Sequence, residues 1–282
     1  MKPLRPGTRG PSIGVCNICG TLGPLTIDHV PPRGCEPPTR KKIEFALSRY
    51  RDRVQDVGRP VTAIAPRISQ SGLNYNTLCS RCNSGLLGTA YDPALIDFSK
   101  QVAGRLNSPL HLPSTMTFQI EPQKVARAVW GHMASVGIDR YLKGPHTEAW
   151  SEWFHDEALP PPGGSSLFYW LYPYRRTVVG RDLGLLRLGQ RSSSIVWMLK
   201  FYPIAFAWVH PGNNFGYPLH DMTPYLLNGV RSAQQIPLSF RRILHEEALE
   251  RPDTSLMIMA GRENVISTSM PMPAVVLRPK RR

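Results

Sequence analysis

Two pairs of cysteines stand out, because each has the spacing of a metal-binding knuckle. Cys16 and Cys19 form the first pair, and Cys79 and Cys82 form the second. A Cys-x-x-Cys knuckle places two sulfur atoms on one side of a tight turn, so two knuckles supply the four corners of a tetrahedral zinc site. The long segment between the pairs, residues 20–78, is typical of a treble clef, in which the second knuckle opens a helix.

A second group of residues has the chemistry of a hydrolytic site. Asp28 and His29 are adjacent, and two prolines soon after them end the extended segment, so both side chains are expected to turn toward one pocket. A carboxylate beside an imidazole combines a hard ligand for a divalent cation with a base near neutral pH. Asn83 follows the second knuckle directly and can present its amide oxygen to the same pocket. An ordinary helix-capping asparagine is the alternative reading of Asn83.

Together these motifs resemble the HNH endonuclease family, in its zinc-knuckle branch, over roughly residues 15–98. The resemblance implies a ββα-metal motif around one catalytic cation. Asp28 matches the family's metal-binding position and His29 its general base. Asn74 matches the middle asparagine, which holds the loop and the histidine in place. Asn83 matches the last signature position, which is commonly histidine.

The resulting His-Asn-Asn set departs from the family's usual pattern. An amide oxygen is a harder ligand than imidazole, so the departure favours Mg²⁺ or Mn²⁺ as the catalytic cation, while Zn²⁺ is structural. The resemblance implies hydrolysis of a phosphodiester, with Arg33 and Arg81 as candidate phosphate contacts; either could equally be a surface charge. It also suggests phage defence, to which some HNH proteins belong.

The bulk composition fits a nucleic-acid partner. The chain has 282 residues, a formal net charge of +14 and 41% hydrophobic residues, which is enough for well-formed cores. Such a positive net charge favours a polyanionic partner, because Lys and Arg that neutralise phosphates release counterions. We expect the partner to be a nucleic acid, and DNA in particular. We find no signal peptide and no membrane-spanning segment, and therefore predict a cytoplasmic protein. Cysteines are then expected to be thiolate ligands rather than disulfides, and Cys35 is assigned no role.

The pattern of helices and strands that must position these residues predicts an α+β fold with three parts. Residues 1–105 form the HNH nuclease module, residues 106–160 a helical segment, and residues 161–282 a β-rich C-terminal domain. Apolar residues at helical spacing predict helices over residues 43–54, 93–105, 122–142, 147–159 and 238–249. Apolar runs punctuated by Gly and Pro predict strands over residues 167–172, 177–179, 195–199, 204–209 and 256–260.

Two other functions stay open at this point. The same cysteines and charge would serve a zinc-dependent nucleic-acid-binding protein without catalysis. The C-terminal half could instead select substrate, form a homo-oligomer or bind a regulatory partner. The remaining histidines show no metal-binding spacing and are interpreted as surface or core residues: His111, His132, His146, His155, His210, His220 and His245.

Overall fold

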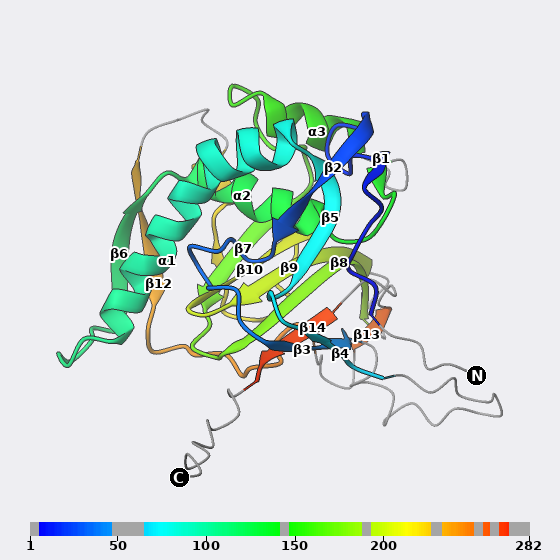
Figure 1. Cartoon of the computed structure of the whole chain (residues 1–282). Coiled ribbons are helices and arrows are strands. Elements are labelled where there is room, and N and C mark those ends of the chain that lie inside the picture. Colours follow the sequence, from blue (N-terminus) through cyan, green and yellow to red (C-terminus); the bar gives the residue numbers. More distant parts are fainter. Residues whose placement is uncertain are drawn as a thin grey trace, which may run out of the picture.

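The computed structural model describes residues 6–46, 65–141, 147–187, 193–226, 233–250, 256–259 and 265–270. Helices lie on one side of a large antiparallel sheet, and a smaller sheet stands beside them (Figure 1). The predicted α+β class is confirmed. None of the helices within these residues is both long enough and apolar enough to cross a membrane.

The small sheet has three strands and carries the first knuckle. Strand β1 (Ile13–Val15) pairs antiparallel with β2 (Leu22–His29), and β2 pairs antiparallel with β5 (Asn74–Cys79). A π-helix, η3 (Arg81–Tyr91), follows β5 and continues without a break as α1 (Asp92–Leu106). Hairpin, second knuckle and helix therefore occur in the predicted order, and β2 ends at His29 as the prolines require.

The large sheet has nine strands, in the order β11-β7-β10-β9-β8-β14-β3-β4, with β13 also paired to β8. Its centre is a run of antiparallel neighbours that confirms the predicted strands and extends them: β7 (Ser166–Leu171), β8 (Arg176–Arg187), β9 (Ser193–Phe201) and β10 (Ile204–His210). The shorter members are β3 (Lys41–Phe45), β4 (Arg67–Ser69), β11 (His220–Asp221), β13 (Leu256–Met259) and β14 (Val265–Ser269).

Both faces of the large sheet are buried, because alternate residues along a strand point to opposite sides. On β10, Phe206 and Trp208 belong to the core beneath the helices, whereas Ala205, Ala207 and Val209 belong to a second core on the other face. The helical layer comprises α1, α2 (Pro122–Ala134) and α3 (Thr147–His155). Helix α2 is buried along almost its whole length.

Four sequence-based predictions are wrong in part. The helix predicted over residues 147–159 ends at His155, the last residue of α3. Residues 41–45 form strand β3 rather than the start of a helix, because every second residue, Lys41, Ile43 and Phe45, is buried. Residues 47–54 of that predicted helix lie outside the described part of the chain. Helix α2 stops at Ala134, ahead of Gly137, whose φ of 85° leaves the helical region. Predicted helix 238–249 is replaced by β12 (Gln234–Ser239) and turns.

Strand β12 pairs with β6 (Thr115–Ile120) in a two-stranded ribbon that the sequence reading missed. The predicted three-part division stays a prediction. Strands β3 and β4, from between the two cysteine pairs, are joined to β14 and β8 in the large sheet. One hydrophobic core extends from Cys16 to Val265.

Candidate functional site

The two cysteine pairs meet at the end of the small sheet. Their four Sγ atoms lie within 4.8 Å of one another, and those of Cys19 and Cys79 are 3.7 Å apart. Four thiolates at ~2.3 Å from a tetrahedral Zn²⁺ are separated by ~3.8 Å, so the cluster has the dimensions of a zinc site. Cys16 and Cys82 are fully buried. The predicted four-cysteine cluster is confirmed, and it suggests a structural zinc site.

Crowding of the sulfur atoms makes their protonation uneven. Hydrogen bonding with Cys19 raises the pKa of Cys16 to about 11, and the same contact lowers the pKa of Cys19. Contacts with Cys16 and Cys19 raise the pKa of Cys82. Zinc binds thiolates, so metal uptake must release protons from this cluster and should weaken as pH falls.

Side chains around the cluster orient the sulfur atoms. Thr21 Oγ1 lies 3.3 Å from Cys19 Sγ, and His155 Nε2 lies 3.4 Å from Cys82 Sγ. The other ring nitrogen of His155 donates to the Ser151 carbonyl, at 2.7 Å. Such neighbours fix the direction of metal ligands in proteins. The sequence reading missed His155 because α3 reaches the cluster only through the tertiary fold.

Asp28 makes a contact that the sequence did not predict. Its Oδ2 lies 3.0 Å from Nδ1 of His132, and Nε2 of the same ring lies 2.9 Å from Oδ1 of Asp92. Asp28 and His132 are 3% and 1% exposed. Burial opposes a charged imidazole, but the two carboxylates outweigh it and raise the pKa of His132 to about 10. His132 is therefore an imidazolium held between two acids.

Asp92 serves this network instead of capping a helix. The Asp-Pro pair predicted a helix start with Asp92 as the N-cap. In the structure Tyr91 precedes the first residue of α1, and no side chain caps it, because η3 runs straight into α1. The Asp92 carboxylate is thereby left to accept the bond from His132.

His29 lies at the end of β2 with a different partner. Its Nε2 is 3.2 Å from a guanidinium nitrogen of Arg33, which is exposed. Burial and then the charge of Arg33 lower the pKa of His29 below its ordinary value of 6.5, so the ring is neutral at physiological pH. The expectation that Asp28 and His29 turn toward one pocket is not what the contacts show: Asp28 turns inward to α2, and His29 contacts a surface arginine.

The two signature asparagines hold backbone and loop positions. Asn83 Nδ2 donates to the Ile27 carbonyl at 3.0 Å and to Thr26 Oγ1 at 2.9 Å, so its amide lies against β2 at these two residues. Asn74 pairs across the sheet with His29, and its Nδ2 donates to Ser71 Oγ at 3.0 Å. Asn74 thus holds the loop that leads into β5. Arg81 is exposed on the first turn of η3.

We predict that His132→Ala lowers the free energy of unfolding by about 3–5 kcal/mol, because it leaves the buried carboxylate of Asp28 and the partly buried carboxylate of Asp92 without their cation. The folded pKa of about 10 exceeds the ordinary 6.5, so this contribution is complete below pH 6.5 and is lost as pH rises through 10. Urea unfolding of the parent protein and of His132→Ala at pH 7 and pH 10 measures this contribution. The difference in the free energy of unfolding between the two proteins should be smaller at pH 10.

His111→Ala is the matched control for this substitution, since His111 is exposed. It should change the free energy of unfolding by less than about 0.5 kcal/mol at either pH. An equally small loss for His132→Ala at pH 7 would show that the imidazole contributes nothing to the fold.

No family model, no curated protein and no solved structure matches this chain.

Proposed function

We propose that the chain is a metal-dependent endonuclease of the HNH type, which hydrolyses phosphodiester bonds in nucleic acid, with DNA as the preferred target. The observation that carries the proposal is the orientation of two oxygen ligands beside β2. Asp28 and Asn83 are each fixed through one atom of the side-chain head group, while the other, Oδ1, accepts no hydrogen bond from any residue within the described ranges.

The Asp28 carboxylate is held on one side only. Oδ2 is bound by the His132 imidazolium, which in turn is fixed by Asp92. Carboxylates that ligate metals are commonly oriented in this way by a hydrogen-bonded neighbour. The second oxygen of Asp28 is then the atom available to a divalent cation.

Asn83 is likewise oriented by hydrogen bonds to one end of its side chain. Both of its amide hydrogens are directed to acceptors on β2, namely Thr26 Oγ1 and the Ile27 carbonyl. This fixes which end of the amide is oxygen, and in our proposal that oxygen shares a cation with Asp28, the residue after Ile27. A carboxylate and an amide oxygen form a donor set suited to Mg²⁺ or Mn²⁺, with waters completing the shell.

His29 would act as the general base. Its lowered pKa leaves the imidazole neutral, as removal of a proton from water requires. The guanidinium of Arg33 donates to His29 Nε2, so the exposed Arg33 would have to turn to the bound phosphate and free this nitrogen before it can accept a proton. The neutral imidazole would take a proton from the water that attacks phosphorus. A divalent cation at Asp28 and Asn83 would stabilise the developing charge and the leaving 3′ oxygen.

The net charge of +14 supports a polyanionic substrate. Arg33 follows the end of β2 and Arg81 follows the end of β5; since these strands are antiparallel, the two exposed arginines lie toward opposite ends of the small sheet, where each could contact the phosphate backbone. The cytoplasmic location, the role in phage defence and the C-terminal half's homo-oligomeric or regulatory contacts remain predictions from the sequence.

The pH dependence of cleavage tests the pairing of His29 with Arg33. The rate should be constant at neutral pH and fall as pH drops through the His29 pKa, which lies below 6.5. Because the charge of Arg33 lowers that pKa, Arg33→Ala should move the fall to higher pH. Nicking rates measured between pH 5 and pH 8 for both proteins give the two profiles.

Arg81→Ala is the control for loss of a positive charge at an exposed site. It should weaken DNA binding without moving the pH profile, since Arg81 has no contact with His29 among the described residues. If Arg33→Ala leaves the acidic fall where it is, His29 is not the group that titrates.

The experiment that decides the function is a plasmid-nicking assay with zinc-loaded protein. Nicking should require added Mg²⁺ or Mn²⁺, cease with EDTA and return when the cation is restored. The runner-up is a zinc-dependent nucleic-acid-binding protein without catalysis, which the 3% exposure of Asp28 favours. Salt-dependent DNA binding with no nicking under any cation would support that reading instead.

A further inference from the structure

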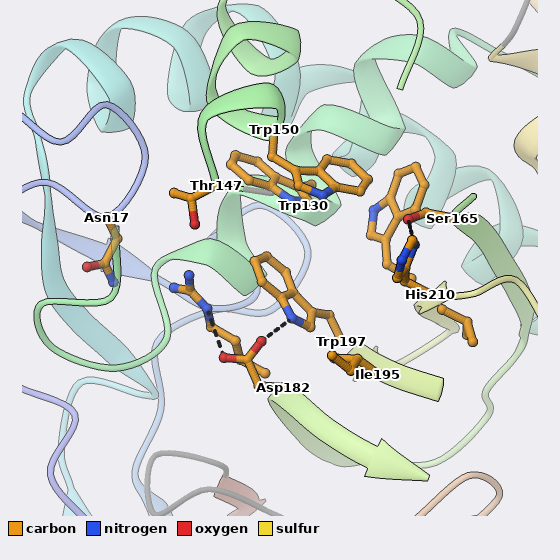
Figure 2. A pocket seen from close by; sticks show the side chains of 12 residues that line it. Asn17, Trp130, Thr147, Trp150, Ser165, Asp182, Ile195, Trp197 and His210 are labelled. Carbon is orange, nitrogen blue, oxygen red and sulfur yellow. Dashed lines mark hydrogen bonds and ion pairs between the residues drawn. The ribbon is translucent and has the colours of Figure 1, made fainter. Parts of the chain in front are cut away.

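A pocket of about 80 Å³ lies between helices α2 and α3 and strands β8 to β10, and Asn17 of the first cysteine knuckle contributes to its lining. Four tryptophans line it: Trp130, Trp150, Trp197 and Trp208. Trp130 and Trp150 stand together on one side, with Trp197 opposite and the Ser165–His210 pair at one end (Figure 2). Nothing in the proposed hydrolytic site uses these residues, so the pocket needs a separate explanation.

The aromatic rings are arranged to receive a flat group. The ring of Trp130 is nearly parallel to those of Trp150 and Trp197, with interplanar angles of 11° and 19°. Trp130 is buried, whereas Trp150 and Trp197 are only partly buried. Ile195, at 42% exposure, lines the same opening. A planar ring entering parallel to these indoles would stack on their accessible faces.

Polar groups complete the rim. Asp182 accepts a hydrogen bond from Trp197 Nε1 at 2.8 Å and forms an ion pair with Arg140. The Ser165 hydroxyl lies 3.1 Å from His210 Nδ1. The indole N–H of Trp208, a residue only 4% exposed, has no hydrogen-bond partner within the described ranges. A buried donor without a partner is costly unless a ligand or water accepts from it.

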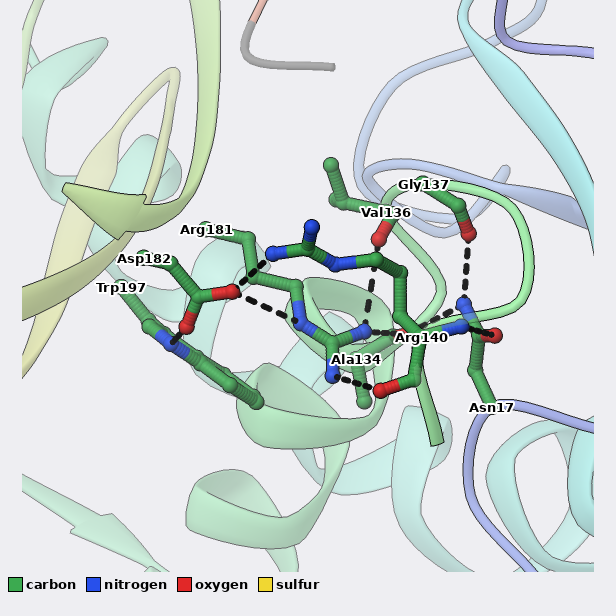
Figure 3. Close-up of polar contacts among 8 residues, drawn as sticks. All are labelled: Asn17, Ala134, Val136, Gly137, Arg140, Arg181, Asp182 and Trp197. Carbon is green, nitrogen blue, oxygen red and sulfur yellow. Dashed lines mark hydrogen bonds and ion pairs between the residues drawn. The ribbon is translucent and has the colours of Figure 1, made fainter. Parts of the chain in front are cut away.

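A distortion of β8 places the charged groups. The pairing of β8 with β9 shifts register between Gly180 and Leu183, and Asp182 has a φ of 55°. A non-glycine residue in this region is strained, and such bulges commonly direct side chains at sites of binding. Figure 3 shows the result: Arg181 donates to the Ala134 carbonyl at 2.7 Å, while Asp182 faces Trp197.

The charges argue against a cationic ligand, although tryptophan cages often bind cations. The guanidinium of Arg181 already lies over Trp197, 4.6 Å from the ring centroid, and Asp182 is paired with Arg140. Two arginines and one aspartate leave a local excess of positive charge. The ligand should therefore be a flat, uncharged ring with hydrogen-bonding edges, attached to something anionic.

We propose that this pocket binds a pyrimidine base of a nucleotide. The base would stack on Trp150, because Arg181 and Trp130 already lie against the ring of Trp197, and its sugar and phosphate would stay outside. At about 80 Å³ the pocket is smaller than a ~150 Å³ cavity that encloses benzene, so it admits only part of a single ring and is too small for a purine. Asp182 could accept from a ring amino group, as carboxylates do from cytosine N4, and Trp208 could donate to a ring carbonyl.

This inference deepens the proposed function, on which it rests for the source of the base. Helix α2 carries both Trp130, in the pocket, and His132, which orients Asp28. The Ala134 carbonyl accepts bonds from Arg181 and from Asn17, which lies within the first knuckle. A base held in the pocket thus belongs to the same rigid frame as the hydrolytic site.

Calorimetric titration of the full-length zinc-loaded protein with CMP tests the proposal. CMP should bind, ribose 5-phosphate and tetramethylammonium should not, and AMP should bind more weakly. Trp150→Ala should lower the affinity for CMP by about fivefold or more, because one stacking partner is lost. Trp150→Phe should restore much of that affinity. Equal binding of ribose 5-phosphate, or unchanged binding by Trp150→Ala, would overturn the proposal.

A second variant covers the case in which Trp150→Ala disturbs the packed indoles. Ile195→Phe fills the opening from an exposed position, so it should keep the fold and weaken CMP to a similar degree. Ile243→Phe is its matched control, because Ile243 is 51% exposed and does not line the pocket. Similar CMP affinity in the two variants would place the nucleotide elsewhere.

Two further arms separate the source of the base and the fate of the nuclease proposal. A cytosine-containing single strand that competes with CMP identifies the base of a strand as the ligand, and failure to compete identifies a free nucleotide. His29→Ala should bind CMP normally. If the parent protein binds CMP but does not nick DNA, only the nuclease proposal is refuted. If it nicks DNA but does not bind CMP, only the assignment of the pocket is refuted.

Discussion

Plasmid nicking by His29→Ala protein is expected to be about 10²–10⁴-fold slower than nicking by the parent, the usual effect of losing a general base. In our proposal the neutral imidazole of His29 is the base that acts beside the oxygen ligands of Asp28 and Asn83. Its side chain contacts the exposed Arg33, so removing it should leave the fold unchanged. Rates are measured at saturating Mg²⁺ and pH 7.5, with zinc content and thermal unfolding determined on the same samples.

Added imidazole should restore part of the lost rate, because a small base can enter the space left by the side chain. His111→Ala, at an exposed histidine, should nick at the parent rate and controls for contaminating nucleases. Undiminished nicking by His29→Ala would remove this residue from the mechanism. Loss of zinc from the variant would mean that the slower rate reflects a damaged fold.

Cys82→Ser should lose zinc and unfold. Cys82 is fully buried in the main core and is one of the four clustered sulfurs. Structural zinc sites contribute ~10–16 kcal/mol of binding free energy to the folded state, which is as large as the whole stability of a typical domain. We expect less than one zinc per chain by mass spectrometry, together with loss of the near-ultraviolet circular dichroism of the tryptophans.

Cys35→Ser is the matched control, because Cys35 is partly buried but lies outside the cluster, with its Sγ 3.5 Å from Ser99 Oγ. Burial raises the pKa of Cys35 to about 12, so it stays a thiol and is no metal ligand. This variant should retain one zinc and fold. A Cys82→Ser protein with full zinc content and an unchanged melting temperature would refute the structural role.

Local patterns predicted those parts of the molecule that local forces determine. The two knuckles predicted the cysteine cluster, and the apolar spacing of Leu95, Phe98 and Val102 predicted α1 within a residue at each end. Strands β7 and β10 were predicted from continuous apolar runs, because both faces of the large sheet are buried.

The elements that the sequence reading missed depend on partners far along the chain. Strand β3 exists because Ile43 and Phe45 pair with β14, and β12 exists because it pairs with β6. The contact between His132 and Asp28 joins residues over a hundred positions apart. No local spacing signals such contacts, and an isolated histidine on a buried helix is indistinguishable from a core residue.

The placement of β3 bears on how the chain can be assembled during synthesis. A ribosome that has released residues 1–105 has supplied the four cysteines of the cluster, but not β14, the strand that pairs with Lys41–Phe45. Until residues 265–269 emerge, Ile43 and Phe45 have no neighbour on that side of the ladder. An N-terminal fragment expressed alone should therefore expose an apolar edge and aggregate, even when supplied with zinc.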